Sequence, residues 1–226
     1  MRAGPCGHGT GQGRTCRINW REHVERERGR YDEGMRRLDP EQLVRLGNAA
    51  YGAGLCLLML GEREEAAEWL ERASARWRES WEHATPTSWG RPIGVIKAAL
   101  IAGDDHAAAA FAAWALGLGC ADAESPIGRY AATLALLVEG RDTEAAGLAE
   151  SLRVEPFPPE VADALVGIST SAEAQYRVAV QRVLTSFETR DEYLEDVPVA
   201  DTVIVLQALA RRRGLAAELD SPLLPG

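Results

Sequence analysis

Residues 54–74 read GLCLLMLGEREEAAEWLERAS, and this stretch contains the pattern that decides the fold. An apolar run ends at Gly61, a residue type that commonly terminates helices, and acidic residues follow it directly. Apolar side chains then return at helical spacing, at Ala66, Trp69 and Leu70, with charged residues on the opposite face. The pattern predicts two helices joined by a tight turn, which together form a helical hairpin.

The same pattern recurs along the chain. It lies around Gly103, in VIKAALIAGDDHAAAAFAAWAL, and around Gly140, in YAATLALLVEGRDTEAAGLAESL, so that the three glycines are 42 and 37 residues apart. A fourth, less regular pair of helices flanks the Ser-Thr-Ser turn at 169–171, and a last apolar helix ends at Gly214. One helical hairpin per repeat of about 40 residues is typical of helical solenoids.

We therefore predict an all-α fold of stacked αα-hairpins with a C-terminal capping helix. Residues 60–73, LGEREEAAEWLERA, resemble tetratricopeptide repeats in the placement of their small residues, which implies a tetratricopeptide-like solenoid. The expected core consists of large apolar residues at helical spacing: Leu57, Leu58, Leu60, Trp69, Leu70, Leu100, Phe111, Trp114, Leu134, Leu137, Val180, Leu184, Val203 and Leu206.

The chain divides into a leader and one domain. Residues 1–15 are rich in glycine and lack hydrophobic periodicity, so we predict a disordered leader there. Whether this leader belongs to the natural chain stays open, because a misassigned start codon would produce a similar segment. We expect residues 16–226 to form a single helical-repeat domain, with order beginning near Asn19.

Several features predict a cytoplasmic protein. The N-terminus lacks the apolar core of a signal peptide, and the longest apolar run, residues 49–60, is too short to cross a bilayer. The four cysteines, Cys6, Cys16, Cys56 and Cys120, are scattered and do not form a disulfide framework. We expect all four to be reduced, with Cys56 buried in its apolar helix and unreactive.

The charge of the chain limits the classes of partner. The formal net charge is −9, which disfavours binding to nucleic acid and to anionic membranes, since both normally require a basic surface. Lys97 is the only lysine, and we attribute this first to genomic base composition.

No residue pattern predicts a metal site, a cofactor or a reaction. Cys6, His8, Cys16 and His23 are the strongest candidate ligands, but their spacing fits no compact zinc motif. The acidic residues after the helix-ending glycines are typical first-turn charges of helices. HExxH and GxSxG motifs are absent from the sequence. We therefore expect no enzyme activity and no cofactor.

Residues 76–92, RWRESWEHATPTSWGRP, hold three of the six tryptophans. The helical spacing places Trp77 in the core between hairpins. Trp81, His83, Trp89 and Arg91 lie at the predicted helix end and in a loop at 84–92, and they are our candidate partner-binding residues. The alternative is that these aromatic residues anchor the loop to the body of the protein.

Two polar residues interrupt the last apolar helix. Asp201 follows Pro198 closely and is interpreted as a charge at the helix N-terminus. Gln207 lies among apolar residues, where we expect it to form a buried hydrogen bond.

The C-terminal third resembles a known family. The segments AEAQYRVAVQRVLTSFETR, VADTVIVLQALARRRGL and AAELDSPLLPG resemble the end of immunity protein 49 family members, and the hairpins at Gly103 and Gly140 resemble their central hairpins. The resemblance spans about residues 90–225. It implies an all-α protein of a bacterial polymorphic toxin system that binds and neutralises a toxin domain. The family provides no catalytic residues to transfer.

Our leading hypothesis is a protein-binding module, of the immunity type, whose partner is a toxin domain. The alternative is a small-ligand-binding or enzymatic helical domain with a pocket near Trp81, His83 and Arg91. A scaffold within a larger complex is a third possibility, and the oligomeric state stays open.

Overall fold

Ten α-helices and two short 3-10 helices make up the computed structural model, which describes residues 18–37 and 39–226; these residues include no strand. The α-helices are α1 (Trp20–Met35), α2 (Pro40–Met59), α3 (Arg63–Trp81), α4 (Gly90–Ala102), α5 (Asp105–Gly117), α6 (Pro126–Val138), α7 (Asp142–Glu150), α8 (Pro159–Ser169), α9 (Glu173–Glu188) and α10 (Asp201–Arg211). The 3-10 helices are η1 (Cys120–Asp122) and η2 (Leu194–Asp196). The predicted all-α class is confirmed. The leader prediction for residues 1–15 lies outside the described residues.

The predicted helix ends are confirmed at all four glycines. Gly61, Gly103, Gly140 and Gly214 have φ angles of 80°, 74°, 72° and 71°. This left-handed conformation is strained for residues with a Cβ, so glycine is the natural terminator of these helices. In the fourth turn, between α8 and α9, Ser171 adopts the same conformation with a φ of 56°.

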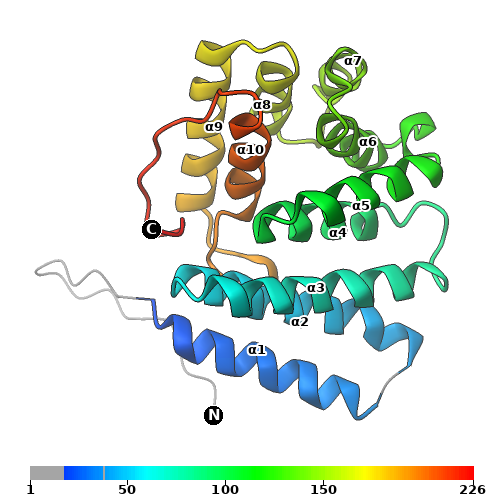
Figure 1. Cartoon of the computed structure of the whole chain (residues 1–226), viewed down its shortest axis with the longest axis vertical. Helices are drawn as coiled ribbons and strands as arrows, with labels where there is room; N and C mark the ends of the chain where they lie inside the picture. The colour runs from blue at the N-terminus through cyan, green and yellow to red at the C-terminus, as the bar shows by residue number, and fades with distance from the viewer. Residues whose placement is uncertain (1–17, 38) are drawn as a thin grey trace, which may run out of the picture.

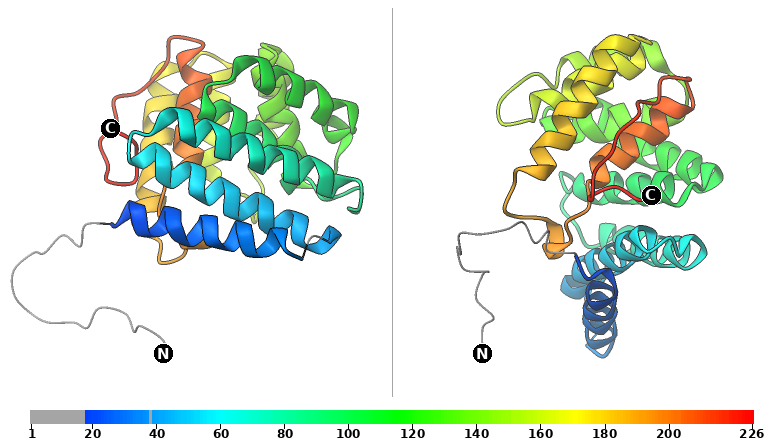
Figure 2. Two further views of the ribbon diagram at one scale, coloured as in Figure 1. Left: turned by 60° about the horizontal axis from the view of Figure 1, so that its bottom comes forward. Right: turned by 90° about the vertical axis from the view of Figure 1, so that its left-hand side faces the viewer.

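Each helix from α1 to α9 packs against the helix that follows it. In Figure 1 α1 to α4 run across the view, whereas α8, α9 and α10 run up it. After α9 the chain returns toward the N-terminal helices. Residues 189–200 connect the end of α9 to α10 and pass beside α2 (Figure 2). We call residues 189–200 the strap.

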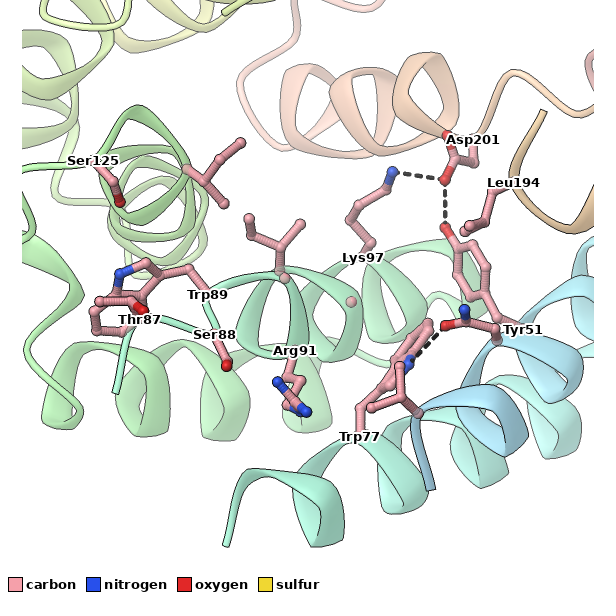
Figure 3. Close-up of a pocket in the computed structure, with 16 residues that line it drawn as sticks. Tyr51, Trp77, Thr87, Ser88, Trp89, Arg91, Lys97, Ser125, Leu194 and Asp201 are labelled. Atoms are coloured by element: carbon pink, nitrogen blue, oxygen red, sulfur yellow. Dashed lines mark hydrogen bonds and ion pairs between the residues drawn. The ribbon is translucent and has the colours of Figure 1, made fainter. Parts of the chain in front are cut away.

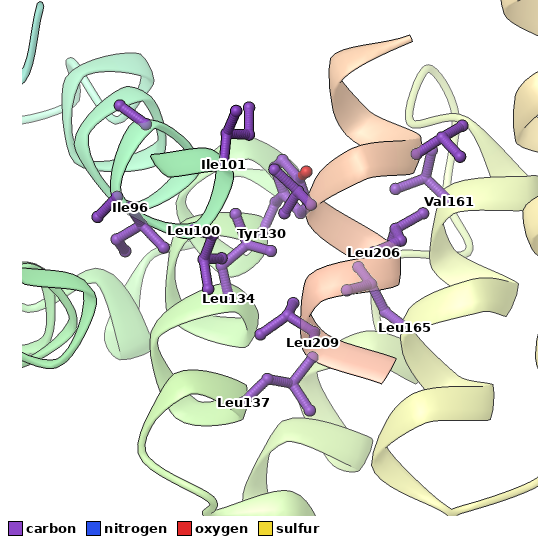
Figure 4. Packing of buried hydrophobic residues seen from close by; sticks show 14 of the residues in the cluster. Ile96, Leu100, Ile101, Tyr130, Leu134, Leu137, Val161, Leu165, Leu206 and Leu209 are labelled. Atoms are coloured by element: carbon purple, nitrogen blue, oxygen red, sulfur yellow. The ribbon is translucent and has the colours of Figure 1, made fainter. Parts of the chain in front are cut away.

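The predicted C-terminal capping helix is α10, but α10 does not cover the end of the stack. The predicted position of this helix is therefore wrong. It packs against α4, α8 and α9, and Figure 4 shows its Leu206 and Leu209 between the side chains of α4 and α6 on one side and those of α8 on the other. Leu206 and Leu209 are fully buried. The physical reason is that α10 is apolar on more than one face, and such a helix requires neighbours on several sides.

Most of the predicted core is confirmed. Leu60, Phe111 and Trp114 are the exceptions among the predicted residues, since each is only partly buried. Phe111 and Trp114 face α3, where the guanidinium of Arg78 lies 5.6 Å and 5.5 Å from their ring centroids. A cation over an aromatic face stabilises a ring that stays partly exposed.

The predicted burial of Cys56 is confirmed, and burial raises the pKa of its thiol to about 12. Burial also raises the pKa of Cys120 to about 11. Cys6 and Cys16 lie outside the described residues. No helix in the described part of the chain combines the length and apolar character that crossing a membrane requires.

Trp77 of α3 packs against both α2 and α4. Its ring lies between two glycines: a Cβ added to Gly47 of α2 would come within 2.5 Å of the ring, and one added to Gly94 of α4 within 2.7 Å. The indole N–H of Trp77 donates a hydrogen bond of 3.1 Å to Oδ1 of Asn48. The predicted core position of Trp77 is confirmed, with 6% of the residue exposed.

We expect Gly47→Ala to destabilise the protein by about 1–3 kcal/mol, because the new methyl group overlaps the ring of Trp77. The control is Gly29→Ala in α1, where a Cβ meets nothing within 4 Å. That substitution should stabilise the protein by up to about 1 kcal/mol through helix propensity. Urea unfolding of both variants tests this, and equal effects would contradict the tight packing at Gly47.

Candidate functional site

A cleft of about 520 Å³ opens where α2, α3, α4, α6 and η2 meet (Figure 3). The aromatic rings of Tyr51, Trp77 and Trp89 line it together with Arg91, Lys97 and Asp201; we call it the aromatic cleft. Its remaining lining residues are mostly apolar or small: Val44, Asn48, Thr87, Ser88, Gly90, Ile93, Gly94, Ser125, Ile127 and Leu194. Cavities of this size and character are typical of binding sites.

Two large apolar side chains of this cleft are exposed. Ile127, at the start of α6, is 48% exposed, and Leu194, in the strap, is 58% exposed. Within the described residues, only Met35, Val154 and Val178 join them as exposed large hydrophobic residues. Isolated exposed apolar residues are common on protein surfaces, but two on one aromatic cleft indicate a contact surface.

A buried ion pair forms one wall of the cleft. Nζ of Lys97 lies 2.6 Å from Oδ2 of Asp201, and the Tyr51 hydroxyl donates a hydrogen bond of 2.8 Å to the same oxygen. Lys97 also donates to Oγ1 of Thr202 at 3.2 Å. The side chains of Lys97 and Asp201 are only 13% and 15% exposed. These contacts join α2, α4 and α10 at a single carboxylate.

The environment of Asp201 favours its charged form. Burial alone would raise the pKa of its carboxyl, but the charge of Lys97 and hydrogen bonds from Lys97, Tyr51 and Thr202 outweigh it, so the pKa lies below its ordinary value. Burial and the negative charge of Asp201 both raise the pKa of Tyr51, which therefore stays a neutral hydrogen-bond donor.

Arg91 is a second cation in the aromatic cleft and has no acidic partner among the described residues. Its Nε donates a hydrogen bond of 2.7 Å to Oγ of Ser80 on α3. Burial lowers the pKa of its guanidinium. In Figure 3 Arg91 extends toward α3, whereas Lys97 extends toward α10.

The strap is held against the N-terminal helices by charged contacts. Arg30 pairs with the carboxylate of Glu195, which also accepts a hydrogen bond of 3.0 Å from Nδ2 of Asn48. Arg26 donates to the carbonyl oxygen of Glu195 at 2.8 Å. Arg26 and Arg30 also pair with Glu27, whose side chain is fully buried. These contacts fix the position of the neighbouring Leu194 at the cleft.

Two smaller clefts adjoin the aromatic cleft. One of about 220 Å³ shares Lys97, Leu194 and Asp201 with it and extends beneath the strap. Another, of about 330 Å³, shares Ile127 and is lined by prolines and aromatic rings of α6, α8 and the segment between α7 and α8. The three clefts therefore lie next to one another around the N-terminus of α10.

The four predicted site residues do not gather in one place. Trp89 and Arg91 line the aromatic cleft, whereas Trp81 lies behind Trp89, with ring centroids 5.7 Å apart. His83 is exposed and does not line the cleft. The pocket of the alternative hypothesis, near Trp81, His83 and Arg91, is thus found only at Arg91.

The loop between α3 and α4 ends earlier than the predicted loop at 84–92. Helix α4 already begins at Gly90. Pro92 therefore lies in the first turn of this helix, where proline is tolerated. Trp89 is only 7% exposed and packs between Trp81 and the start of α6, where a Cβ on Gly128 would come within 2.9 Å of its ring nitrogen. The ring edge of Trp89 that faces α6 therefore anchors the segment between α3 and α4. Another part of Trp89 lines the aromatic cleft.

Sequence reasoning missed the Lys97–Asp201 pair as part of the site. The signal was present, since Lys97 is the only lysine of the chain and lies within an apolar helix. Asp201 does begin α10 as predicted, and its pairing with Lys97 is an additional role. The buried hydrogen bond predicted for Gln207 is confirmed, because its Oε1 accepts from the Tyr176 hydroxyl at 2.7 Å.

In the residues that the structure describes, no group of three or more His, Cys, Asp or Glu side chains is arranged to hold a metal ion. Of the candidate metal ligands, His23 lies in α1, and Cys6, His8 and Cys16 lie outside the described residues.

Comparison of the chain with protein-family models, curated proteins and solved structures yields no match.

We expect Lys97→Met to cost about 3–5 kcal/mol of stability, because it leaves the Asp201 carboxylate buried without its partner. The double variant Lys97→Met/Asp201→Asn should lose clearly less than the sum of the two single variants. Urea unfolding of the three variants forms a double-mutant cycle. Strictly additive losses would contradict a direct coupling between the two side chains.

The same pair predicts a pH dependence. Because the folded-state pKa of Asp201 is lowered, its contribution to stability is present above the ordinary carboxyl pKa of about 3.9 and is lost as pH falls through the lower folded value. The difference in unfolding free energy between the natural protein and Asp201→Asn should thus be constant near neutral pH and shrink below about pH 4. A difference that grows with acidity would contradict this assignment.

We expect Trp89→Ala to cost about 3–5 kcal/mol, since it removes a large ring from the contact with Trp81 and α6. The control is His83→Ala, an exposed residue six positions earlier, which should change stability by less than about 0.5 kcal/mol. Thermal unfolding monitored by circular dichroism provides both values. A mild effect of Trp89→Ala would show that its burial contributes little.

Proposed function

We propose that the protein is a protein-binding helical module and that the aromatic cleft receives a segment of its partner. The observation that carries this proposal is the exposure of Ile127 and Leu194 at a cleft lined by tryptophan, tyrosine and arginine. Tryptophan, tyrosine and arginine are the residues that most often dominate binding energy at protein interfaces. An arriving segment would cover the two exposed apolar side chains.

A small ligand is the second candidate occupant. The volume of about 520 Å³ lies in the usual range for small-molecule sites, which supports it. Two observations favour a protein segment. Two further clefts lie next to the aromatic cleft, and Ile127 and Leu194 would stay largely exposed above a small molecule held deep inside.

We further propose a tetratricopeptide-like arrangement and an immunity-type role. The serial packing of α1 to α9, each helix on the next, supports a solenoid, although α10 fills part of the hollow that a simple solenoid leaves open. The resemblance of the C-terminal segments to the immunity protein 49 family supports a toxin domain as the partner. A net charge of −9 suits a basic partner of this kind, which it would attract over long range in the cytoplasm.

Site-specific photocrosslinking tests this proposal. With benzoylphenylalanine in place of Ile127, we expect irradiation in native cells to yield one discrete protein adduct, because the probe would lie at the covered edge of the cleft. Mass spectrometry of the adduct identifies the partner, and a toxin domain would support the immunity-type role.

The matched control carries the probe at Val154, between α7 and α8, which is 44% exposed and lines neither the aromatic cleft nor the two clefts beside it. No discrete adduct should form there. Equal labelling from both positions, or none from position 127, would contradict the proposal. A low-mass compound retained by the purified protein in native mass spectrometry would favour the small-ligand alternative.

A further inference from the structure

The net charge of the aromatic cleft is opposite in sign to the net charge of the whole chain. Its ionisable lining groups at neutral pH are two cations, Arg91 and Lys97, and one carboxylate, Asp201. Lys97 and Asp201 neutralise each other at 2.6 Å. The charge of Arg91 is therefore the one uncompensated positive charge of the cleft. The chain as a whole carries a formal net charge of −9.

The cleft also offers more hydrogen-bond donors than acceptors. A guanidinium has five N–H groups, and the only side-chain hydrogen bond of Arg91 within the described residues runs from Nε to Oγ of Ser80. Lys97 donates to Asp201 and Thr202, which leaves one of its three N–H groups. An occupant that supplies acceptor oxygens would satisfy these donors.

Apolar surface surrounds these donors on both sides. Ile127 lies at the α6 side of the cleft, and Leu194 lies at the strap side. A carboxylate next to apolar groups matches this arrangement, because a guanidinium binds a carboxylate with two parallel hydrogen bonds. A cluster of several acidic residues does not match, since the acidic surface of the chain would repel it.

We propose that the aromatic cleft binds a segment of a net-basic partner protein in which a single aspartate or glutamate is flanked by apolar side chains, with Arg91 as the receptor for that carboxylate. This inference rests on the proposed function and specifies its partner. The charge of −9 attracts the basic partner over long range, and the local positive charge at Arg91 selects the one acidic residue that enters the cleft.

Peptide selection provides the first test. A random peptide library displayed on phage is selected on the immobilised full chain, and bound phage are tested against an uncharged Ile127→Asn variant to identify cleft-dependent binders. We expect these binders to share one acidic residue with apolar neighbours on both sides. Cleft-dependent binders without an acidic residue would overturn the carboxylate inference and leave the proposed function standing. A selection without any cleft-dependent binder would count against both.

A double-mutant cycle provides the second test. The acidic residue of a selected peptide is changed to its amide, and affinities for the natural protein and for Arg91→Gln are measured by fluorescence anisotropy. The amide should weaken binding to the natural protein at least about tenfold, which corresponds to about 1.4 kcal/mol, and should have almost no effect on Arg91→Gln. Equal weakening on both proteins would overturn the role of Arg91.

Two controls keep this cycle interpretable. Arg177→Gln removes an exposed arginine of α9 outside the aromatic cleft and should not change the effect of the amide. If Arg91→Gln unfolds because it loses the contact with Ser80, Arg91→Lys retains a donor and the positive charge. Lysine lacks the planar fork, so it should bind the acidic peptide more weakly than arginine while still preferring it to the amide. No preference for the acidic peptide in folded Arg91→Lys would overturn the inference.

Discussion

The ion pair between Lys97 and Asp201 is the contact on which the arrangement of the helices depends. It joins residues 104 positions apart in the sequence, and the Tyr51 hydroxyl reaches the same carboxylate from 150 positions away. A buried ion pair contributes little net stability, but removing one partner is costly, so such a pair is well suited to fixing register. Here it fixes the N-terminus of α10 against α2 and α4, and this placement produces one wall of the aromatic cleft.

The strap gives the cleft its outer edge at a local energetic cost. Glu195 and Asp196 both have φ angles of 56°, a left-handed conformation that costs roughly 1–2 kcal/mol for each residue with a side chain. The contacts of Glu195 with Arg26, Arg30 and Asn48 offset this strain. The result is an unusual backbone that holds Leu194 at the cleft with its side chain exposed.

Local sequence signals predicted the helices well and their distant contacts poorly. Gly61, Gly103 and Gly140 end helices because of their own conformational freedom, which needs no knowledge of the fold. The place of α10 depends on which neighbours cover its several apolar faces, and periodicity carries no such information. Trp89 and Arg91 were found through loop composition, whereas Lys97 and Asp201 were not linked because nothing local marks a pair so far apart. The only lysine in the chain was the available clue.

The central position of α10 constrains how the protein is made. Ribosomes synthesise residues 201–211 after all the other helices, and domains begin to fold while the chain is still growing. The hairpins from α1 to α9 are able to form locally as they emerge, yet the apolar sides of α4, α6 and α8 that face Leu206 and Leu209 have nothing to cover them until α10 has been synthesised. We therefore expect the nascent chain to expose an apolar surface that is prone to aggregation until α10 packs between these helices.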